Sequence, residues 1–303
     1  MSVVIPVKDG GKDLRRCLDG VARQRFDDDV EIVVVDSGSR DDSRDVARSF
    51  GARVHQIAPH EFNHGATRNL GVSLASGRYL VFTSQDAEPD GDDWLSRLVA
   101  PLREDETIAG VYGRQVPHAD AKPPERFFLE FLYGPVPKVQ RAARREELSM
   151  QTTLFSNANS VIRRDVLERF PFVEDIIMSE DQEWSKRVLL AGYAIYYEPL
   201  AVVRHSHPYT VRAAFRRFFD SGVSADRSYL AGARPSQMVL YREATRYARE
   251  ELKYLVRTGN ARWIPYAAIY ELAKFAGLQL GGSHARLPRR LKVRFSATPS
   301  YWG

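Results

Sequence analysis

The sequence contains little cysteine and no long apolar run. Cys17 is the only cysteine among 303 residues, so the chain has no disulfide framework and no cysteine-based metal site. Such scarcity is typical of a reducing compartment. No window approaches the roughly 20 apolar residues that cross a bilayer. Met1 leads directly into SVVIPV, without the basic stretch and cleavage site of a signal peptide, so we expect a cytoplasmic protein.

The sequence also lacks internal repeats and low-complexity segments. Its 44% hydrophobic and 27% charged residues are ordinary for a globular protein, and its length permits one large domain or two smaller ones.

Acidic residues are scarce in the last third of the chain. Residues 201–303 contain 18 Lys and Arg against 6 Asp and Glu, whereas residues 1–200 contain 26 against 33. The excess of positive charge indicates an anionic partner for the C-terminal part. Nucleic acid, an anionic membrane surface and a polyphosphate ligand are all candidates.

Short β-branched runs alternate with helical patterns in the first part of the chain. The runs cover residues 2–7, 30–35, 53–57 and 78–83. Their alternation with helices predicts right-handed βαβ units and an α/β fold with a mostly parallel sheet. Ligands of such sheets bind at the carboxyl ends of the strands, where the polar segments DSGSRDD and SQDAEPD follow.

The pattern changes after residue 104. We expect strands at residues 108–116, 155–162 and 194–197, short helices at 126–132 and 165–170, and a basic loop at 135–149 that serves as a lid or an acceptor contact. From residue 210 the chain is expected to be all helical, with amphipathic, Arg-rich helices at 211–229, 238–256 and 263–280.

Two adjacent acids, Glu180 and Asp181, stand in the first turn of a helix predicted within IIMSEDQEWSKRVLL. Ser179 and Gln182 have the spacing of a capping box, and the helix dipole favours negative charge in this turn. A carboxylate held in this way is suited to act as a base, although acids at a helix start can also serve the dipole alone.

Asp36 follows the second predicted strand and Asp86 follows the fourth. Nucleotide-binding α/β domains present carboxylates at such positions to a base or ribose and to a metal-bound diphosphate. Either residue alone can equally be a helix N-cap. Their occurrence together with Glu180 and Asp181 favours a catalytic site.

These segments resemble the family 2 glycosyltransferases, which have the GT-A fold. The matching stretches are SVVIPVKDG, EIVVVDSGSRDDS, HGATRNLGVSLASGRYLVFTSQDAEP, NANSVIRRDVL and MSEDQEWSKRVLLAGY. Within the family, EFNHGATRNLG, TSQDA and the tail LPRRLKVRFS look like the bacterial rhamnosyltransferases. The resemblance implies a GT-A catalytic domain over residues 1–208, a nucleotide-sugar half up to about residue 103, an acceptor half over 104–208, and a basic α-helical region over 209–303.

The resemblance also implies a donor site. Asp36 would bond to the pyrimidine edge and Arg68 would meet the diphosphate, which a guanidinium fork suits. The DxD motif of the family falls on Ser84-Gln85-Asp86, so its first acid is missing and Asp86 remains as the metal ligand. The expected donor-binding residues are Pro6, Val7, Asp9, Asp36, Ser37, Arg68, Ser84, Gln85 and Asp86.

A metal bound by Asp86 needs another protein ligand. Similar enzymes place a histidine after the strand that follows the base helix, and VRHSHPY supplies His205, with His207 as the fallback. An imidazole ligand favours Mn²⁺ over Mg²⁺ without excluding Mg²⁺. The alternative is a histidine pair that binds no metal.

The implied reaction is a single inverting displacement. Asp181 would act as the general base toward an acceptor hydroxyl, and Glu180 would orient or bind acceptor hydroxyls. Weaker candidates for sugar or acceptor contacts are His64, Asn63, Asn157, Asn159 and Trp184. Asparagine in a loop is as often a turn former.

The basic tail has two interpretations. Residues 281–294 place cations beside apolar residues, and aromatic residues Trp263, Tyr266, Tyr270 and Phe275 precede them. This pattern suits peripheral docking on an anionic inner-membrane surface, where a polyprenyl-diphosphate-linked glycan acceptor lies. The alternative is a solvated basic bundle that packs on the catalytic domain or on a second subunit of a homodimer.

The leading hypothesis is therefore a metal-dependent inverting transferase that moves L-rhamnose from dTDP-rhamnose to a surface polysaccharide such as an O-antigen. A UDP- or GDP-sugar donor would leave the same motifs. A catalytically inactive sugar-nucleotide-binding protein is an alternative because Ser84 replaces an acid, but the Glu180–Asp181 pair argues against it. The chain lacks a recognisable nucleic-acid motif and the membrane spans and QxxRW motif of a processive synthase.

Overall fold

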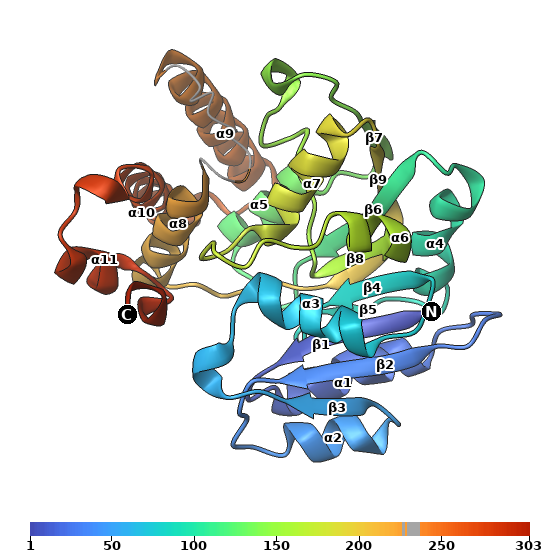
Figure 1. Ribbon diagram of the computed structural model, residues 1–303. Helices are drawn as coiled ribbons and strands as arrows, with labels where there is room; N and C mark the ends of the chain where they lie inside the picture. The colour runs from blue at the N-terminus through green and yellow to red at the C-terminus, as the bar shows by residue number, and fades with distance from the viewer. Residues whose placement is uncertain (226–227, 229–236) are drawn as a thin grey trace.

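The computed structural model describes residues 1–225, 228 and 237–303. Figure 1 shows a twisted sheet with helices on both faces and a group of C-terminal helices standing to one side of it. The α/β class and the C-terminal helical extension predicted from the sequence are confirmed.

The sheet is parallel in its first half and mixed in its second. Its strand order is β3-β2-β1-β4-β8-β6-β9-β5, and β7 pairs with β9. The four strands β1 to β4 run parallel, β8 runs antiparallel to both β4 and β6, and β6 and β9 are parallel. The strands are β1 Ser2–Val7, β2 Glu31–Asp36, β3 Arg53–Gln56, β4 Tyr79–Thr83, β5 Glu88–Pro89, β6 Ile108–Val116, β7 Lys138–Gln140, β8 Asn159–Arg163 and β9 Ala194–Arg204.

Two apolar cores lie on the two faces of the sheet because strand side chains alternate between them. Helices α1, α2 and α4 contribute Leu14, Val46 and Leu98 to one core. Helices α6 and α7 contribute Val166 and Trp184 to the other, and α3 packs at its margin. The helices of this part are α1 Gly11–Ala22, α2 Ser43–Ser49, α3 His64–Leu74, α4 Trp94–Glu104, α5 Pro123–Leu132, α6 Arg164–Arg169 and α7 Glu180–Leu190.

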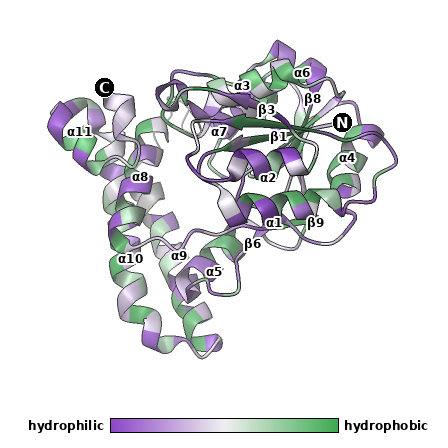
Figure 2. Ribbon diagram, turned by 90° about the horizontal axis from the view of Figure 1, so that it is seen from below, coloured by the Kyte–Doolittle hydropathy of each residue, from purple (hydrophilic) through white to green (hydrophobic). Residues whose placement is uncertain are grey.

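The extension consists of α8 Val211–Ala225, α9 Gln237–Arg257, α10 Ile264–Gly282 and α11 Arg289–Phe295. Helices α8 and α10 touch backbone to backbone through Gly222, Gly277 and Gly281, where an added Cβ would overlap a carbonyl oxygen of the facing helix. Helix α9 packs on α5 through aromatic residues around Phe127 and Tyr254. Figure 2 shows α9 and α10 reaching beyond the α/β part.

Several predicted boundaries change. The strand expected over 155–162 begins only at Asn159, and the strand expected over 194–197 continues to Arg204 because β9 pairs with β6 on both sides of a bulge. The loop expected over 135–149 contains β7. Helix α8 is described as far as Ala225, and the end of the predicted helix 211–229 falls largely outside the described residues. Within the described chain, no helix is long and apolar enough to cross a membrane.

Candidate active site

The strand directions bring the predicted acids to one edge of the sheet. Parallel β1, β2 and β4 end there, followed by Asp36 and Asp86, and antiparallel β8 begins there because Thr83 pairs with Asn159. The main-chain N–H of Asn157, just before β8, donates to Asp181 Oδ2 at 3.1 Å. The base candidate therefore lies on the same edge as the nucleotide and metal candidates.

Asp36 is fully buried at the end of β2. Its Oδ1 accepts hydrogen bonds from the main-chain N–H groups of Gly38 and Ser39, both at 3.2 Å, while Oδ2 is buried without a partner in the described chain. An unpaired buried carboxylate oxygen is costly unless a ligand pairs with it. The neighbouring Ser37 hydroxyl donates to the carbonyl of Val7 at 3.0 Å, so it holds β1 and β2 together.

The first loop is shaped by side chains that bond to the main chain. Asp9 has a positive φ of 48°, and its Oδ1 accepts from the N–H of Arg40 at 2.7 Å. Gln85 accepts from the N–H of Lys8 at 2.8 Å and donates to the Lys8 carbonyl at 3.0 Å. Gln85 therefore joins the ends of β1 and β4, which accounts for an amide within the predicted DxD segment.

Asp86 faces both predicted histidines. Its carboxylate lies 3.5 Å from Nε2 of His205 and 3.6 Å from Nδ1 of His207, and the three candidate ligand atoms lie within 4.8 Å of one another. One carboxylate and two imidazoles form a donor set that could hold a divalent metal ion. The structure thus brings both histidines, rather than His205 alone, to the metal candidate.

The orientation of His205 is set by Gln115, which the sequence analysis did not identify. Gln115 Nε2 donates to the hydroxyls of Tyr133 at 2.8 Å and Ser156 at 2.9 Å. Its Oε1, 2.8 Å from His205 Nδ1, must therefore accept from an Nδ1–H group. This tautomer leaves Nε2 unprotonated, which is the atom that faces Asp86.

The surroundings of Asp86 and His207 favour the protonation states in which these side chains can bind a metal. Burial opposes ionisation of Asp86, but its contacts with His205 and His207 together outweigh burial and lower the pKa of Asp86 to about 2. Burial lowers the pKa of His207 to about 4. Near pH 7 the site therefore presents an ionised carboxylate and a neutral His207 imidazole.

Helix α7 begins as predicted, but without the predicted capping box. Ser179 adopts a left-handed conformation with φ 65° and its side chain makes no capping bond, so that prediction is wrong. Asp181 instead accepts from its neighbour, with Oδ1 2.8 Å from the N–H of Gln182. The hydrogen bond from the Asn157 N–H to Asp181 holds the start of α7 against the loop before β8, and the capping box expected from the sequence does not form.

Asp181 and Glu180 are electrostatically different. Burial, followed by the charge of Glu180, raises the pKa of Asp181 to about 7. Burial also disfavours charge on Glu180, but several opposing effects, of which the guanidinium of Arg68 is the largest, together outweigh burial and lower the pKa of Glu180. Arg68 Nη1 lies 3.0 Å from Glu180 Oε1, so the residue expected at the diphosphate is engaged by an acid of α7.

Two predicted contacts are wrong. Trp184 is fully buried, with ring centroids 5.0 Å from Phe155 and 6.4 Å from Phe172, so it belongs to the core. Asn159 is also fully buried; its Oδ1 accepts from the Trp94 indole at 2.8 Å and its Nδ2 donates to two carbonyls. Neither side chain can reach a sugar without disrupting this packing.

The remaining weaker candidates lie near the acids. Asn157 Nδ2 donates to Glu180 at 3.1 Å. Asn63 caps α3 by accepting from the N–H groups of Gly65 and Ala66, which is the turn-forming role left open by the sequence. His64 is half-buried beside Glu180 and Arg68, and burial lowers its pKa to about 4.

The comparisons with known proteins agree with this geometry. Residues 2–170 match the family described as Glycosyl transferase family 2. The chain belongs to glycosyl transferase family 2. It is 35% identical to O-antigen chain rhamnosyltransferase WbaN of Salmonella anatum, over 90% of this chain and 86% of that protein. It is 34% identical to O-antigen chain rhamnosyltransferase RfbN of Salmonella typhimurium, over 100% of this chain and 96% of that protein.

Solved structures show the same fold. The mannosyltransferase PcManGT from Pyrobaculum calidifontis, in complex with GDP-Man and Mn²⁺, has a TM-score of 0.55 at 19% identity, covering 99% of this chain and 84% of that chain. Glucosyl-3-phosphoglycerate synthase of Mycobacterium tuberculosis, with Mn²⁺ and UDP-glucose, has a TM-score of 0.53 at 20% identity, covering 78% and 80%. The GT-A fold is therefore confirmed, and this family 2 protein is a glycosyltransferase.

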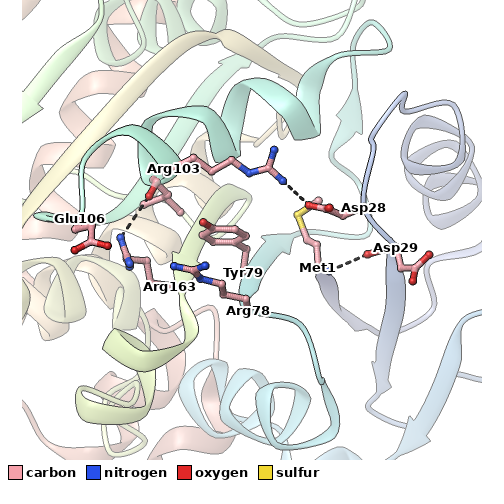
Figure 3. A pocket seen from close by; sticks show the side chains of 9 residues that line it. Met1, Asp28, Asp29, Arg78, Tyr79, Arg103, Glu106 and Arg163 are labelled. Atoms are coloured by element: carbon pink, nitrogen blue, oxygen red, sulfur yellow. Dashed lines mark hydrogen bonds and ion pairs between the residues drawn. The ribbon is translucent and has the colours of Figure 1, made fainter.

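A pocket on the opposite edge of this glycosyltransferase is not part of the candidate active site. Figure 3 shows it beside Met1 and Tyr79, at the amino ends of β1 and β4. Two of its arginines are already engaged, Arg103 with Asp28 and Arg163 with the Leu102 carbonyl. The acids and histidines of the candidate site lie at the carboxyl ends of the strands.

We predict that Gln115→Leu weakens Mn²⁺ binding by about 10- to 100-fold, because the His205 ring loses the partner that fixes its tautomer. Asp86→Ala should abolish binding. The measurement is titration calorimetry with Mn²⁺. The control is His60→Ala, because His60 is an exposed histidine. An unchanged affinity of Gln115→Leu would show that the metal binds elsewhere or that the amide plays no part.

Proposed function

We propose that this chain is an inverting, metal-dependent glycosyltransferase that moves L-rhamnose from dTDP-rhamnose to a hydroxyl of a growing O-antigen. The observation that carries the proposal is the position of Asp181, on the same sheet edge as Asp36 and the Asp86–His205–His207 group. The two Salmonella relatives, named as O-antigen chain rhamnosyltransferases, support the sugar and the acceptor.

The donor and the acceptor would bind in different halves of the catalytic domain. We assign residues 1–103 to the nucleotide-sugar and residues 104–208 to the acceptor, with the helical region starting at 209. Asp36, with its unpaired Oδ2, would accept a hydrogen bond from the nucleotide base. Pro6, Val7 and Asp9 stand beside it at the end of β1.

The proposed reaction is one displacement. An acceptor hydroxyl oxygen bonds to C1 of the sugar while the bond from C1 to the diphosphate oxygen breaks, so the anomeric centre inverts and the nucleoside diphosphate leaves. Asp181 takes the hydroxyl proton, and its raised pKa of about 7 makes it a stronger base than an ordinary carboxylate.

A divalent metal fits the residues present. Asp86, His205 and His207 would hold it, and when bound it would neutralise the charge on the leaving diphosphate. The two solved structures described above contain Mn²⁺, which supports Mn²⁺ over Mg²⁺. Their donors, GDP-Man and UDP-glucose, also keep a GDP- or UDP-sugar as the second candidate.

The outer face of α10 supports a peripheral membrane position. Ala268, Ile269, Leu272 and Ala276 lie on one exposed side of the helix, with Ile269 58% and Leu272 69% exposed, opposite the buried Tyr270. The two charged residues of α10, Glu271 and Lys274, pair with each other at 2.8 Å toward the inner side.

Charge around this apolar face favours an anionic bilayer as its occupant. From residue 252 to residue 303 the sequence has nine Lys and Arg and one acid, Glu271. Cations that flank this helix in the sequence match anionic headgroups above an apolar interior. A polyprenyl-diphosphate-linked acceptor at the cytoplasmic face of the inner membrane would then lie within reach of the site.

We expect Asp181→Asn to fold normally and to lose about a hundredfold or more in turnover, because the acceptor hydroxyl loses its base. In the unaltered enzyme, turnover should rise as pH increases through about 7, since the carboxylate must be deprotonated to accept a proton and its pKa is about 7. Steady-state rates from pH 5 to 9 test both expectations. Near-normal turnover of Asp181→Asn would assign the base to another group.

Thermal unfolding with dTDP, UDP and GDP, each with and without Mn²⁺, identifies the donor class. A bound nucleotide stabilises the folded state in proportion to the logarithm of its concentration over its dissociation constant. We expect dTDP with Mn²⁺ to give the largest rise in melting temperature. Stabilisation by UDP or GDP alone would favour the second candidate donor, and no response to any nucleotide would contradict the transferase proposal.

We expect the double variant Ile269→Asp, Leu272→Asp to lose co-sedimentation with vesicles that contain anionic lipid. Contact with the bilayer would bury the two new carboxylates in an apolar interior, which is unfavourable. Leu200→Asp is a matched control, since Leu200 is a comparably exposed leucine (61%) in β9. Sedimentation that is independent of anionic lipid, or light scattering that shows a dimer dissociated by the double variant, would assign this face to a second copy of the chain.

A further inference from the structure

Arg68 and Glu180 form an ion pair that is buried beside the candidate base. Nη1 of Arg68 lies 3.0 Å from Oε1 of Glu180, and the side chains are only 8% and 5% exposed. Most of the described ion pairs between an arginine or lysine and a carboxylate lie nearer the surface. Burying two charges costs several kcal/mol of desolvation per ion, so a pair of this kind rarely adds stability by itself. Its position suggests a functional reason.

The pair is held by further hydrogen bonds to Asn157 and to the main chain of α3. Asn157 donates from its side-chain amide to Glu180 at 3.1 Å and from its main chain to Asp181 at 3.1 Å, so one residue fixes both carboxylates. Arg68 Nη1 also donates to the His64 carbonyl at 3.0 Å within α3. The guanidinium is thus anchored by α3 and by α7.

We propose that Arg68 and Glu180 are a positioning pair that sets the protonation of Asp181, with Arg68 keeping Glu180 ionised and the Glu180 charge making Asp181 hold its proton more tightly. This proposal rests on the proposed function, in which Asp181 is the general base. It assigns Arg68 to the acceptor side of the site rather than to the diphosphate.

The charges that face Asp181 support this division of roles. Burial raises the pKa of Asp181 most, the charge of Glu180 raises it further, and Arg68 lowers it by a smaller effect. The other neighbours are neutral: the N–H groups of Asn157 and Gln182, which donate to Asp181, and the buried Tyr133 hydroxyl after α5, whose pKa is itself raised. None of these can supply the negative charge that Glu180 brings.

Two further titratable or charged groups approach from the other helices packed there. His64 of α3 lies beside Glu180, and burial lowers its pKa to about 4, so it is neutral near pH 7. Arg217 of α8 acts on His64 and bonds to Met178 Sδ at 3.1 Å. The ionised acid nearest to Asp181 is therefore Glu180, and its counter-ion is Arg68.

The first test is the pH profile of Glu180→Gln. Glutamine keeps the shape and can still accept from Asn157, but it removes the neighbouring charge. We expect the acid limb of the turnover profile to move to lower pH by about one unit or more, as loss of a like charge does for a neighbouring carboxylate. Turnover above pH 8 should fall about three- to tenfold, because a weaker base accepts the proton less readily.

The matched control is Glu183→Gln in the same helix. Glu183 is also buried and paired with an arginine, Arg187, at 2.7 Å, but it does not contact Asp181. This variant should leave the acid limb where it is. A shift in both variants would mean that any change in α7 alters the profile, and would overturn the proposal.

The second test examines Arg68 by a double-mutant cycle. Arg68→Met leaves Glu180 without its counter-ion, so it should lower the melting temperature in the parent protein and much less in the Glu180→Gln background. Affinity for dTDP with Mn²⁺, measured by calorimetry, should stay within about threefold in both backgrounds. If Arg68→Met weakens nucleotide binding by the same large factor in both, Arg68 contacts the diphosphate and the proposal is wrong.

The outcomes also separate this proposal from the proposed function. If Asp181→Asn keeps its activity, the assignment of the base fails and the pair has no role to set. If Asp181→Asn is inactive while Glu180→Gln changes only the KM for the acceptor, Asp181 stands as the base and Glu180 binds the acceptor. That result would overturn the positioning role alone.

Discussion

The site depends on the antiparallel pairing of β4 with β8. This pairing aligns Thr83 with Asn159 and so places the residue before β8, Asn157, at the carboxyl end of β4. From there its N–H and its amide reach the two acids of α7. Asp86, after β4, and Asp181, in α7, are far apart along the chain, and this contact holds them at the same edge of the sheet. A single main-chain reversal in the sheet thus brings the two halves of the chemistry together.

Most charged and polar groups at this edge are satisfied within the protein. Gln115 links His205 to Ser156 and Tyr133, and Gln85 links β4 to the Lys8 main chain. These bonds hold the side chains in place before any ligand arrives, which is what a preorganised site requires. Asp36 Oδ2 and Arg68 Nε are exceptions among the described residues, and both belong to groups at this edge.

In the C-terminal extension, α8 and α10 pack closely on each other, whereas the outer face of α10 is exposed. Glycines let α8 and α10 approach each other closely, and aromatic residues join α9 to α5. The extension reaches the site through Tyr209, whose ring stacks on His207 with centroids 5.2 Å apart, and through Tyr266, which bonds to the Tyr209 carbonyl at 3.4 Å. Tyr266 of α10 is therefore linked through Tyr209 to His207 of the metal candidate.

Local pattern alone determined much of this protein. Alternating β-branched runs and helical periodicity predicted the parallel half of the sheet, and the acids at strand and helix ends indicated which edge carries the site. The same reasoning misassigned Ser179, Trp184 and Asn159. A capping-box spacing, an aromatic residue in a helix and an asparagine in a motif look alike whether they face a ligand or the core.

The tertiary structure decided which side chains are available and what state they are in. Gln115 was not identified from the sequence because its partners, at Tyr133, Ser156 and His205, are 18, 41 and 90 residues away. The ion pair of Arg68 with Glu180 likewise joins α3 to α7. Residue types and their order are local properties, whereas burial and charge at an atom depend on everything packed around it. The sequence by itself therefore determined the fold class and the candidate chemistry, and only the packing decided the partner of each charge.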